Sequence, residues 1–431
     1  MRSASLWRAL LGVEKAVIEG VDFDGQAVVV RVRARRGGRR RCGVCGRAAP
    51  RYDQGRGRRR WRGLDLGSVE VFIEADVPRV DCPVHGPTVS QVPWARHGAG
   101  HTRGFDDQVA WLATKCSKTA VTELMRVSWR TVGNIIARVC ADIDARVDRL
   151  SGLRRIGIDE ISYRKGQKFL TVIVDHDTSR LVWARPGRDA KTLDQFFDQL
   201  GEDRAAQLTH VSADTANWIT QTVTVRAPQA IITADPFHVI AWATQCLDDV
   251  RRQVWNQARK APGGQTLAGS RVGLRYNLSK GDAQKIQRSR YALWKNPEDL
   301  TVNQRAKLDW IAATSPVLHR AYLLKEGLRW VFKVKGAEGK QALDQWLVWA
   351  QRCRIDTFIE LGQKIRRHLP AIHAALDEQL SNAIVESVNT KIRLITRVAF
   401  GFHGPEPLIA LAMLSLGGPK PSLPGRTSTH T

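Results

Sequence analysis

The sequence predicts a multidomain α/β protein in which strand-rich and helix-rich stretches follow one another along the chain. Hydrophobic residues alternate with a period of two within residues 1–95 and again within residues 151–240, which is typical of strands. Residues 100–150 instead have a helical period, and residues 241–380 form a long helical, basic stretch with seven of the fourteen tryptophans. With 431 residues, 43% of them hydrophobic, the chain can build two or three domains with sizeable cores.

The first 95 residues contain three strand-like runs. The segment "AVIEGVDFDGQAVVVRVRA" predicts two strands joined at Asp24-Gly25, a hairpin turn signal. The segment "VEVFIEADVPRV" at residues 69–80 predicts a further strand. Residues 86–104 are rich in Gly, Pro and His and are interpreted as a linker. Residues 1–95 are therefore predicted to form a β-rich domain.

Positive charge is concentrated in this N-terminal part of the chain. The formal net charge is +25, and residues 31–62 alone hold fourteen arginines and one acid, Asp53. Such an excess predicts a polyanionic partner, and arginine suits bidentate contacts with phosphates and base edges. A GC-rich genome, which raises arginine content everywhere, is the alternative explanation. The arginines expected to contact DNA are Arg35, Arg36, Arg39, Arg40, Arg41, Arg58, Arg59 and Arg60.

A membrane surface is the other partner that positive charge could serve. No apolar run reaches the roughly 18–20 residues that a spanning helix needs, and the N-terminus shows no signal peptide. The chain has seven cysteines, an odd number, which favours reduced thiols over a disulfide framework. We therefore expect a cytoplasmic protein with no membrane partner.

Two pairs of metal-ligand residues occur at the same short spacing. Cys42 and Cys45 lie in "RCGVCGRA", and Cys82 and His85 follow in "DCPVHGPT". Two such pairs on turns can form a tetrahedral Cys₃His zinc site, and the strands between them fit a zinc ribbon. The alternative is that the two pairs are coincidental. Cys116, Cys140, Cys246 and Cys353 fall in helical patterns and are expected in the core.

Three short helical runs in residues 100–150 predict a helix-turn-helix. The last run, "SWRTVGNIIARVCADI", opens on Ser128, a favourable N-cap. Because the turn before it has no glycine, an ordinary three-helix segment without DNA contacts remains the alternative. We expect Leu124, Val132, Ile135 and Ile136 inside, and Trp129, Arg130, Thr131 and Asn134 facing outward toward DNA.

Three carboxylates occupy positions that favour metal-dependent chemistry. Asp159 ends the strand-like "RIGIDE", Asp214 ends "THVSAD", and Glu386 lies on the last helical run, "SNAIVESVNTKIRLITR". Carboxylate oxygens bind Mg²⁺, and two such ions can serve phosphoryl transfer. For Glu386 alone, a solvated helix face is the simpler explanation. On that helix a polar stripe of Glu386, Asn389, Arg393 and Arg397 is predicted opposite an apolar face of Ile384, Val388, Ile392 and Ile395.

The chain resembles the insertion-sequence transposases of the ISL-three family. The resemblance is carried by "IGIDE", "HVSADTANW", "DPFHV" and "SNAIVESVNTKIRLITRVAFGFH", and it extends over nearly the whole chain. It implies an RNase H-like mixed-sheet core interrupted by an all-α insertion and preceded by a β-rich zinc ribbon and a helix-turn-helix. The implied domains are residues 1–95, 100–150, 151–240, 241–380 for the insertion, 381–415 for the final core helix, and 416–431 as a disordered tail.

The same resemblance implies the catalytic residues and their cofactors. Asp159, Asp214 and Glu386 match the three acids of the DDE motif, which would hold two Mg²⁺ ions for which Mn²⁺ can substitute. Cys42, Cys45, Cys82 and His85 would hold a structural Zn²⁺, although relatives often show two cysteines in the second pair. The expected substrate is double-stranded DNA, both transposon ends and target, bound by a homodimer or a larger assembly. Lys391, Arg393 and Arg397 would neutralise phosphates near the cut.

A further aspartate–histidine pair needs a separate interpretation. Asp235 ends the strand-like "IITAD" and His238 follows three residues later. The resemblance assigns the second acid to Asp214, one strand earlier, and a hard ion such as Mg²⁺ has little use for imidazole. We therefore interpret Asp235 and His238 as a supporting pair that orders the turn into the insertion, together with Asn389 and Arg393 as supporting residues.

Two other functional classes explain part of the sequence. A zinc-ribbon and helix-turn-helix regulator without catalysis accounts for the first 150 residues but leaves the three carboxylates without a role. An RNase H-like nuclease keeps the carboxylates but needs no binding of specific DNA ends. A DDE transposase, which binds terminal inverted repeats and carries out Mg²⁺-dependent cleavage and strand transfer, accounts for all parts of the chain.

Overall fold

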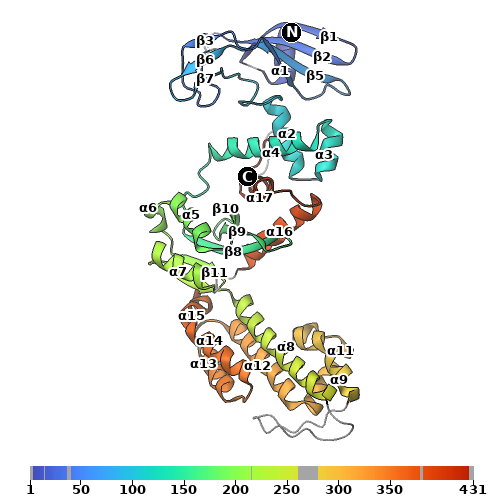
Figure 1. The fold of residues 1–431 in the computed structure, drawn as a ribbon, viewed down its shortest axis with the longest axis vertical. Coiled ribbons are helices and arrows are strands. Elements are labelled where there is room, and N and C mark those ends of the chain that lie inside the picture. Colours follow the sequence, from blue (N-terminus) through green and yellow to red (C-terminus); the bar gives the residue numbers. More distant parts are fainter. Residues whose placement is uncertain are drawn as a thin grey trace. The chain divides into compact units, whose positions relative to one another are not determined.

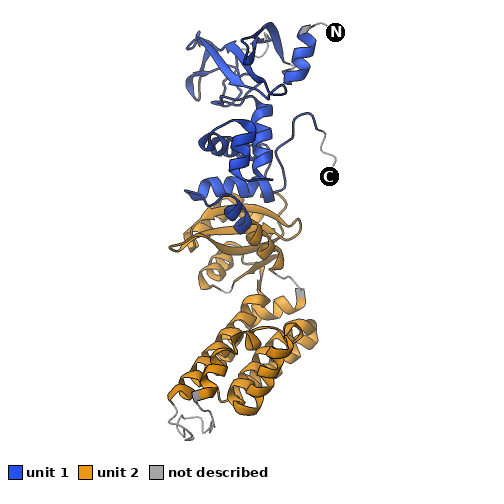
Figure 2. Ribbon diagram, turned by 90° about the vertical axis from the view of Figure 1, so that its right-hand side faces the viewer, with its two compact units in different colours: residues 1–149, 392–431 blue, residues 150–391 orange. Residues whose placement is uncertain are grey.

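The structure, a computed structural model, describes residues 3–13, 15–35, 40–214, 216–260, 280–378 and 382–426. It forms two compact units, coloured separately in Figure 2. The first unit combines Met1–Arg149 with Ile392–Thr431, and the second is Leu150–Lys391. Among the described residues, no helix has both the length and the apolar character that crossing a bilayer requires.

The first unit contains a four-stranded sheet in the order β1-β2-β5-β4. β1 and β2 pair antiparallel around the expected turn, where Asp24 Oδ1 accepts hydrogen bonds from the backbone N–H groups of Gln26 and Ala27 at 3.0 and 2.7 Å. Buried side chains such as Val30 and Ile73 form the core of this part. The elements are α1 (Ser3–Leu11), β1 (Ala16–Phe23), β2 (Ala27–Ala34), β4 (Arg58–Arg62) and β5 (Glu70–Asp76).

A second, three-stranded sheet consists of β3 (Arg51–Asp53), β6 (Arg79–Cys82) and β7 (Gly86–Val89). The run at residues 69–80, predicted as one strand, therefore contains the whole of β5 and the start of β6. The prediction of a linker over residues 86–104 is wrong, because this segment begins with β7 and continues with side chains packed in the interior. Trp94, Ala95 and Ala99 are all buried.

Three helices follow, as expected for residues 100–150: α2 (Arg103–Ala113), α3 (Lys118–Met125) and α4 (Trp129–Asp144). Ser128 caps α4, its hydroxyl accepting a hydrogen bond from the backbone N–H of Thr131 at 3.3 Å. Arg126 adopts a left-handed conformation (φ +52°) between α3 and α4, so the turn forms without glycine. Leu124 is 62% exposed, and the prediction that it packs inside is wrong; Val121 and Met125 fill the interior of α3 instead.

A helix that the sequence analysis did not separate lies near the C-terminus. Residues 381–415 were expected to hold one final helix, but the structure has two, α16 (Ala383–Val398) and α17 (Pro405–Leu416). Gly401, with φ +98°, lies in the break between them. α17 packs against α4 within the first unit. Residues 405–416 therefore complete the core beneath the helix-turn-helix.

The second unit is built on a five-stranded sheet in the order β10-β9-β8-β11-β12. The three successive strands predicted from the sequence pair antiparallel, whereas β11 is parallel to both β8 and β12. Ile158, Ile173 and Phe196 are fully buried in the core. The elements are β8 (Arg155–Arg164), β9 (Lys168–Asp175), β10 (Arg180–Pro186), α5 (Ala190–Leu200), α6 (Glu202–Ala205), β11 (His210–Ala213), α7 (Asn217–Arg226) and β12 (Ile231–Ala234).

The stretch after β12 is helical, as expected, and forms a bundle with its own core (Figure 1). That core includes Ala234 of β12 and Val239, so the bundle is continuous with the edge of the sheet. The helices are α8 (Pro236–Lys260), α9 (Lys280–Gln287), α10 (Arg290–Trp294), η2 (Pro297–Asp299), α11 (Val302–Thr314), α12 (Pro316–Val334), α13 (Gly336–Arg352), α14 (Asp356–Arg367) and α15 (Leu369–Glu378).

Lys325 is a buried cation in this bundle and gives a stability prediction. Its Nζ donates hydrogen bonds to the carbonyl oxygens of Leu293 and Lys295 at 3.0 and 3.4 Å and pairs with Glu326. Lys325→Met leaves these acceptors without their donor, so we expect the free energy of unfolding to fall by roughly 1–3 kcal/mol. Thermal unfolding followed by circular dichroism measures this. Lys340→Met, which removes only a half-exposed ion pair with Asp377, should change stability little.

Candidate active site

Three aspartates occupy equivalent positions on three neighbouring strands of the five-stranded sheet, β8, β11 and β12. The parallel pairing places Ala213 of β11 opposite Ile158 of β8 and also opposite Ala234 of β12. The next residues along the three strands are Asp159, Asp214 and Asp235. The register of the parallel strands therefore aligns all three carboxylates, two of which the sequence analysis expected to be catalytic.

Asp159 is held by two hydrogen bonds and is partly buried. Its Oδ1 accepts from the backbone N–H of Glu160 at 2.7 Å, and its Oδ2 accepts from Nδ2 of Asn389 at 2.7 Å. Burial raises the pKa of Asp159, and the neighbouring carboxylates of Asp235 and Asp214 raise it further, against the lowering effects of the Glu160 hydrogen bond and His238. A carboxylate in such surroundings is stabilised by any cation that joins it.

His238 lies between the other two aspartates. Its Nδ1 is 2.8 Å from Oδ2 of Asp235, and its Nε2 is 4.0 Å from Oδ2 of Asp214. The hydrogen bond to Asp235 and the charge of the nearby carboxylates raise the pKa of His238 to about 9, so the imidazole is protonated at neutral pH. Asp235 Oδ1 also accepts from the backbone N–H of Phe237 at 3.1 Å, which fixes the first turn of α8. The pair thus orders the turn into the helical bundle and also adjoins Asp214.

The remaining candidate residues lie on one helix, α16. Glu386 lies in its first turn and is exposed, and Asn389, one turn further on, is 1% exposed and contacts Asp159. The predicted polar stripe is therefore wrong for Asn389, which shares the buried face with Val385 and Val388. Arg393 and Arg397 of the stripe are exposed, as is Lys391, and Ile384 and Ile395 of the predicted apolar face are only half-buried.

The donor atoms at this edge fit a hard divalent cation. Asp159 and Asp214 offer carboxylate oxygens, which Mg²⁺ prefers. The Oδ1 atom of Asn389 is buried and has no hydrogen-bond partner among the residues that the structure describes. Such an acceptor is costly to bury unless a cation or water satisfies it. His238, the imidazole beside this cluster, already bonds to Asp235.

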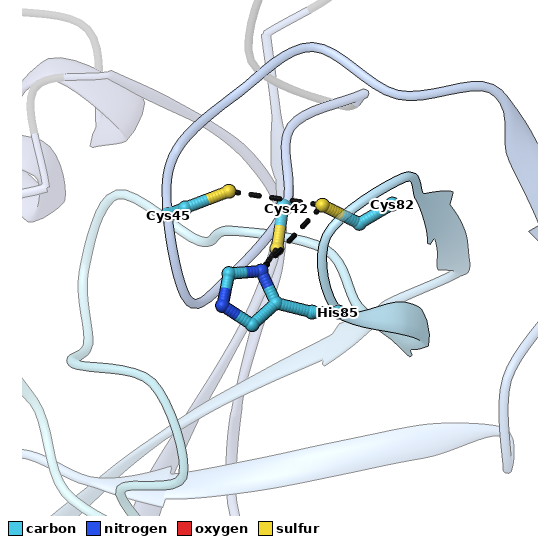
Figure 3. A group of neighbouring side chains, drawn as sticks. All are labelled: Cys42, Cys45, Cys82 and His85. Carbon is cyan, nitrogen blue, oxygen red and sulfur yellow. Dashed lines mark hydrogen bonds between the residues drawn. The ribbon is translucent and has the colours of Figure 1, made fainter.

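The predicted zinc ligands converge, as Figure 3 shows. Cys42, Cys45, Cys82 and His85 place their ligand atoms within 4.8 Å of one another. Cys45 Sγ lies 3.7 Å from Cys82 Sγ, and His85 Nδ1 lies 3.6 and 3.8 Å from the Sγ atoms of Cys82 and Cys42. Zn–S bonds of about 2.3 Å in a tetrahedron separate ligand atoms by roughly 3.7 Å. The site therefore has the size and chemistry of a structural zinc site.

The electrostatics of this cluster favour a metal-binding thiolate. The hydrogen bond with His85 lowers the pKa of Cys82 to about 6, assisted by the backbone N–H of Val84. Gly46, with φ +71°, and Gly86, with φ +61°, each follow the second residue of a ligand pair and close its turn. Turns of this kind present two ligands three residues apart to one ion.

The arginines expected to contact DNA differ in their exposure and in the groups that their side chains contact. Arg58 and Arg60 project from β4 but pair with Asp76 and Glu74 of β5, with N···O distances of 3.6 and 2.7 Å. Arg59 instead lies over the ring of Trp61 at 5.4 Å. Arg35, Arg40 and Arg41 are exposed, whereas Arg36 and Arg39 lie outside the described residues.

The start of α4 exposes the residues expected for a recognition helix. Trp129 is 44% exposed, with Lys118 Nζ 5.2 Å from its ring centroid. Arg130 and Asn134 are also exposed, and Thr131 is half-buried. The opposite face of α4, including Val132 and the two isoleucines expected inside, is buried. The helix therefore has the two-sided character of a helix-turn-helix element.

Three known sequence patterns match successive parts of this chain. Residues 38–85 match the zinc-finger of the transposases of IS204, IS1001, IS1096 and IS1165, and residues 90–140 match the helix-turn-helix domain of transposase family ISL3. Residues 156–412, more than half of the chain, match the DDE transposase domain of that family. The chain belongs to the ISL3 transposase family.

Individual members of the ISL3 family are similar over most of their length. The transposase for insertion sequence element IS1557 of Mycobacterium tuberculosis, from strains CDC 1551 and H37Rv, is 60% identical over 438 residues. That alignment covers 99% of this chain and 98% of the relative. The transposase for IS1001 of Bordetella parapertussis is 27% identical over 353 residues, covering 81% of this chain and 82% of the relative. The zinc ribbon, the helix-turn-helix and the DDE domain thus occur here in one ISL3 transposase.

This ISL3 transposase also has a buried polar chain beside the aspartates that the sequence analysis missed. His176 Nε2 lies 2.6 Å from Ser212 Oγ, and Ser212 Oγ lies 2.7 Å from Oδ1 of Asn382 at the start of α16. All three residues are buried. Ser212 lies two residues before Asp214, so the chain ties β11 to the helix that carries Glu386. In the sequence, the only indication that these segments pack closely is Gly157, a small residue between two isoleucines.

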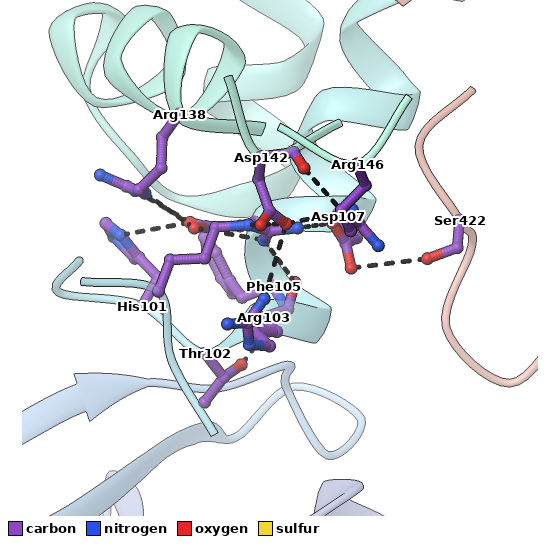
Figure 4. A network of polar contacts seen from close by, with 11 residues as sticks. His101, Thr102, Arg103, Phe105, Asp107, Arg138, Asp142, Arg146 and Ser422 are labelled. Carbon is purple, nitrogen blue, oxygen red and sulfur yellow. Dashed lines mark hydrogen bonds and ion pairs between the residues drawn. The ribbon is translucent and has the colours of Figure 1, made fainter. Parts of the chain in front are cut away.

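A second polar network joins the helices of the first unit, as Figure 4 shows. Arg96, which is 6% exposed, contacts Asp107 at 2.6 Å and Asp142 at 2.9 Å, and its Nη1 lies 3.6 Å from Asp106. Arg138 of α4 makes two hydrogen bonds to Asp106, at 2.9 and 3.0 Å. The segment expected to be a linker in this ISL3 transposase thus anchors α2 and α4 by charged groups.

Proposed function

We propose that Leu150–Lys391 with the rest of α16 is an RNase H-like DDE core interrupted by a helical insertion, and that the chain moves an insertion sequence by Mg²⁺-dependent DNA cleavage and strand transfer. The observation that carries this is the alignment of Asp159 and Asp214 on adjacent parallel strands, with Asn389 of α16 bonded to Asp159. Glu386 lies one turn from Asn389 on that helix. The sheet order, three antiparallel strands followed by two parallel ones, is the arrangement expected of such a core.

Each residue of the cluster has a distinct task in this proposal. Asp159, Asp214 and Glu386 hold the metal ions, and Asn389 orients the Asp159 carboxylate. Two Mg²⁺ ions, when bound, supply activation of the attacking oxygen and stabilisation of the leaving oxygen. The Asp235–His238 pair keeps Asp214 oriented, because the imidazolium lies within 4.0 Å of that carboxylate. A preorganised ion pair of this kind holds the Asp214 carboxylate in place before DNA arrives.

The reaction follows from what such a site does with DNA. Water attacks the phosphodiester at the element end, the P–O3′ bond breaks, and the end keeps a free 3′-hydroxyl while the flank keeps a 5′-phosphate. That hydroxyl then attacks a target phosphodiester and forms a new P–O bond as another 3′-oxygen leaves. Exposed cations on α16, Lys391, Arg393 and Arg397, neutralise nearby phosphates.

The first unit would recognise the element ends. Its exposed arginines, Arg35, Arg40 and Arg41, are free to bind phosphates, and Trp129 with Arg130 begins the recognition helix. Arg59 on β4 would also bind phosphate. Arg58 and Arg60 would exchange their partners Asp76 and Glu74 for DNA phosphates. Counterion release by these arginines makes end binding strongly salt-dependent. We further propose a working complex of at least two chains, because two ends are joined, in the bacterial cytoplasm at the nucleoid.

Zinc removal gives a prediction for the Cys₃His cluster. Cys82→Ser should reduce the zinc content from about one ion per chain to near zero and unfold the ribbon, because structural zinc supplies folding free energy. Metal analysis and thermal unfolding measure both effects. Cys116→Ser is the matched control, since Cys116 lies after α2 and its Sγ donates to the carbonyl oxygen of Leu112 on that helix. Equal zinc content in the two variants would show that the cluster does not hold the metal.

One experiment tests the proposed function directly. The protein is incubated with Mg²⁺, a labelled duplex containing an element end, and supercoiled plasmid. A transposase yields nicked ends with 3′-hydroxyls and then labelled plasmid. A nuclease yields only cleaved duplex, and a regulator yields a shifted but intact duplex. Absence of joined product under conditions of end binding contradicts the proposal.

A further inference from the structure

The C-terminal turn of α14 carries positive groups with no assigned role. Lys364 and Arg367 lie in this turn, and His368 is its C-cap residue. Among the residues that the structure describes, none of the three has a carboxylate within ion-pair distance. We call these three residues the α14 basic edge. Arg366 lies in the same turn but donates to Oε1 of Gln351 on α13 at 3.2 Å.

Lys364 and His368 of the α14 basic edge contact α8, the helix that also carries His238. Lys364 Nζ lies 3.5 Å from the ring centroid of Trp242, and the His368 ring lies 5.8 Å from it. Trp242 lies one helical turn beyond His238 on α8, so both side chains share a face. His238 Nε2 in turn lies 4.0 Å from Asp214 Oδ2. The basic edge therefore lies against the same face of α8 that presents His238 to Asp214.

The charges of these residues respond to one another. Burial lowers the pKa of Lys364 and of His368, and Arg367 lowers both further. The carboxylate of Asp214 acts in the opposite direction on both groups. Lys364 and His368 are thus close enough to Asp214 for its negative charge to affect their pKa values.

We propose that the α14 basic edge binds the phosphate backbone of the DNA strand that enters the aspartate cluster. This rests on the proposed function, because only a DNA substrate brings phosphates to Asp214. Lys364 and Arg367 add positive charge from the insertion beside the path of a strand that approaches Asp214. The cation–π contact with Trp242 holds Lys364 toward α8 in the absence of DNA.

Helix-dipole stabilisation is the competing explanation, since cations favour the C-terminus of any helix. It applies equally to Arg366, which occupies the same turn. The two explanations therefore differ in what they predict for Arg366 and for the pair Lys364 and Arg367. The double variant K364Q/R367Q, the charge-keeping variant K364R/R367K and the control R366Q form a matched set.

The test uses the full chain, a labelled element-end duplex and Mg²⁺. Ethylation interference maps the phosphates that binding requires, and single-turnover cleavage gives the rate from the preformed complex. For K364Q/R367Q we expect loss of interference at phosphates beside the cut and a roughly tenfold slower cleavage. The salt slope of the end-binding constant, from gel-shift titration, should fall by about one per lost contact. R366Q and K364R/R367K should behave like the wild type, and thermal unfolding should show that all variants are folded.

The outcomes separate this inference from the proposed function. Unchanged interference and cleavage in K364Q/R367Q, or equal losses in R366Q, overturn the inference and leave the proposed function intact. A wild-type chain that binds ends but never cleaves them contradicts the proposed function. In that case the interference map alone still decides whether the basic edge contacts DNA.

Discussion

Asp214→Asn and Glu386→Gln are each expected to reduce DNA cleavage and joining by roughly 10³-fold or more, because each removes a charged ligand from a two-metal site. Both changes keep the size of the side chain. Binding of the element end should stay within about twofold of the wild type, since the arginines and the recognition helix carry that affinity. Cleavage in single-turnover conditions and gel-shift titration with the same duplex measure the two effects.

Two controls make the result decisive. Asp203→Asn changes an exposed acid on α6 in the same unit and should leave both measurements unchanged. Partial recovery of Asp214→Asn by Mn²⁺, which accepts amide oxygen more readily, would support a role in metal binding. If Asp214→Asn and Glu386→Gln cleave at the wild-type rate, the assignment of these acids is wrong, and a regulator or another catalytic centre has to be considered.

Gly157→Ala is expected to lower both the stability and the activity of the core. A Cβ at residue 157 would lie 2.3 Å from Cγ2 of Val385, 3.0 Å from Nε2 of His176 and 3.2 Å from Oγ of Ser212. These atoms belong to α16 and to the polar chain that ties it to β11, so α16 must move away from the sheet. We expect the free energy of unfolding to fall by roughly 1–3 kcal/mol, and cleavage to slow as Glu386 and Asn389 shift.

A double-mutant cycle tests the cause of this effect. Val385→Ala removes the nearest clashing atom, so Gly157→Ala combined with Val385→Ala should cost less than the two single changes added together. Chemical unfolding and single-turnover cleavage are measured on all four chains. Gly100→Ala, where an added Cβ meets nothing within 4 Å, is the control. Strict additivity of the two changes would show that the close contact between β8 and α16 does not limit the core.

The sequence predicted well those features that depend on local pattern. The hairpin at Asp24-Gly25, the cap at Ser128 and the convergence of Cys42, Cys45, Cys82 and His85 are all present. Each depends on residues close together or on spacing that one ion requires. The family was also predicted correctly, because its motifs lie along most of the chain.

Features that depend on long-range packing were predicted less well. Asn389 was placed on a polar stripe because its side chain is polar, but its hydrogen bond to Asp159, 230 residues away in the sequence, buries it. Leu124 was placed inside because it is apolar, although Val121 and Met125 already fill that face of α3. Residues 86–104 were interpreted as a linker from their composition, yet Arg96 finds its partners only in the folded unit.

Asp235, the third of the aligned aspartates, shows that strand order along the chain does not by itself identify the metal ligands. Asp235 was separated from Asp214 because it follows a later strand, and the parallel register places the two on neighbouring strands. Which of these acids binds metal stays a prediction, and Asp235→Asn tested beside Asp214→Asn would answer it. The His176–Ser212–Asn382 chain had no signal in the sequence beyond a single glycine, because its members come from three separate elements.

The packing of α17 against α4 determines when the helix-turn-helix can finish folding during synthesis of the chain. α4 emerges from the ribosome early, whereas α17 is made only after the whole Leu150–Lys391 unit. At translation rates of roughly 5–20 residues per second, the intervening roughly 240 residues take on the order of 10–50 s. During that interval the apolar side of α4 lacks its final cover. A nascent chain that lacks α17 therefore carries an incompletely covered α4, and the synthesis of α17 supplies the missing contacts.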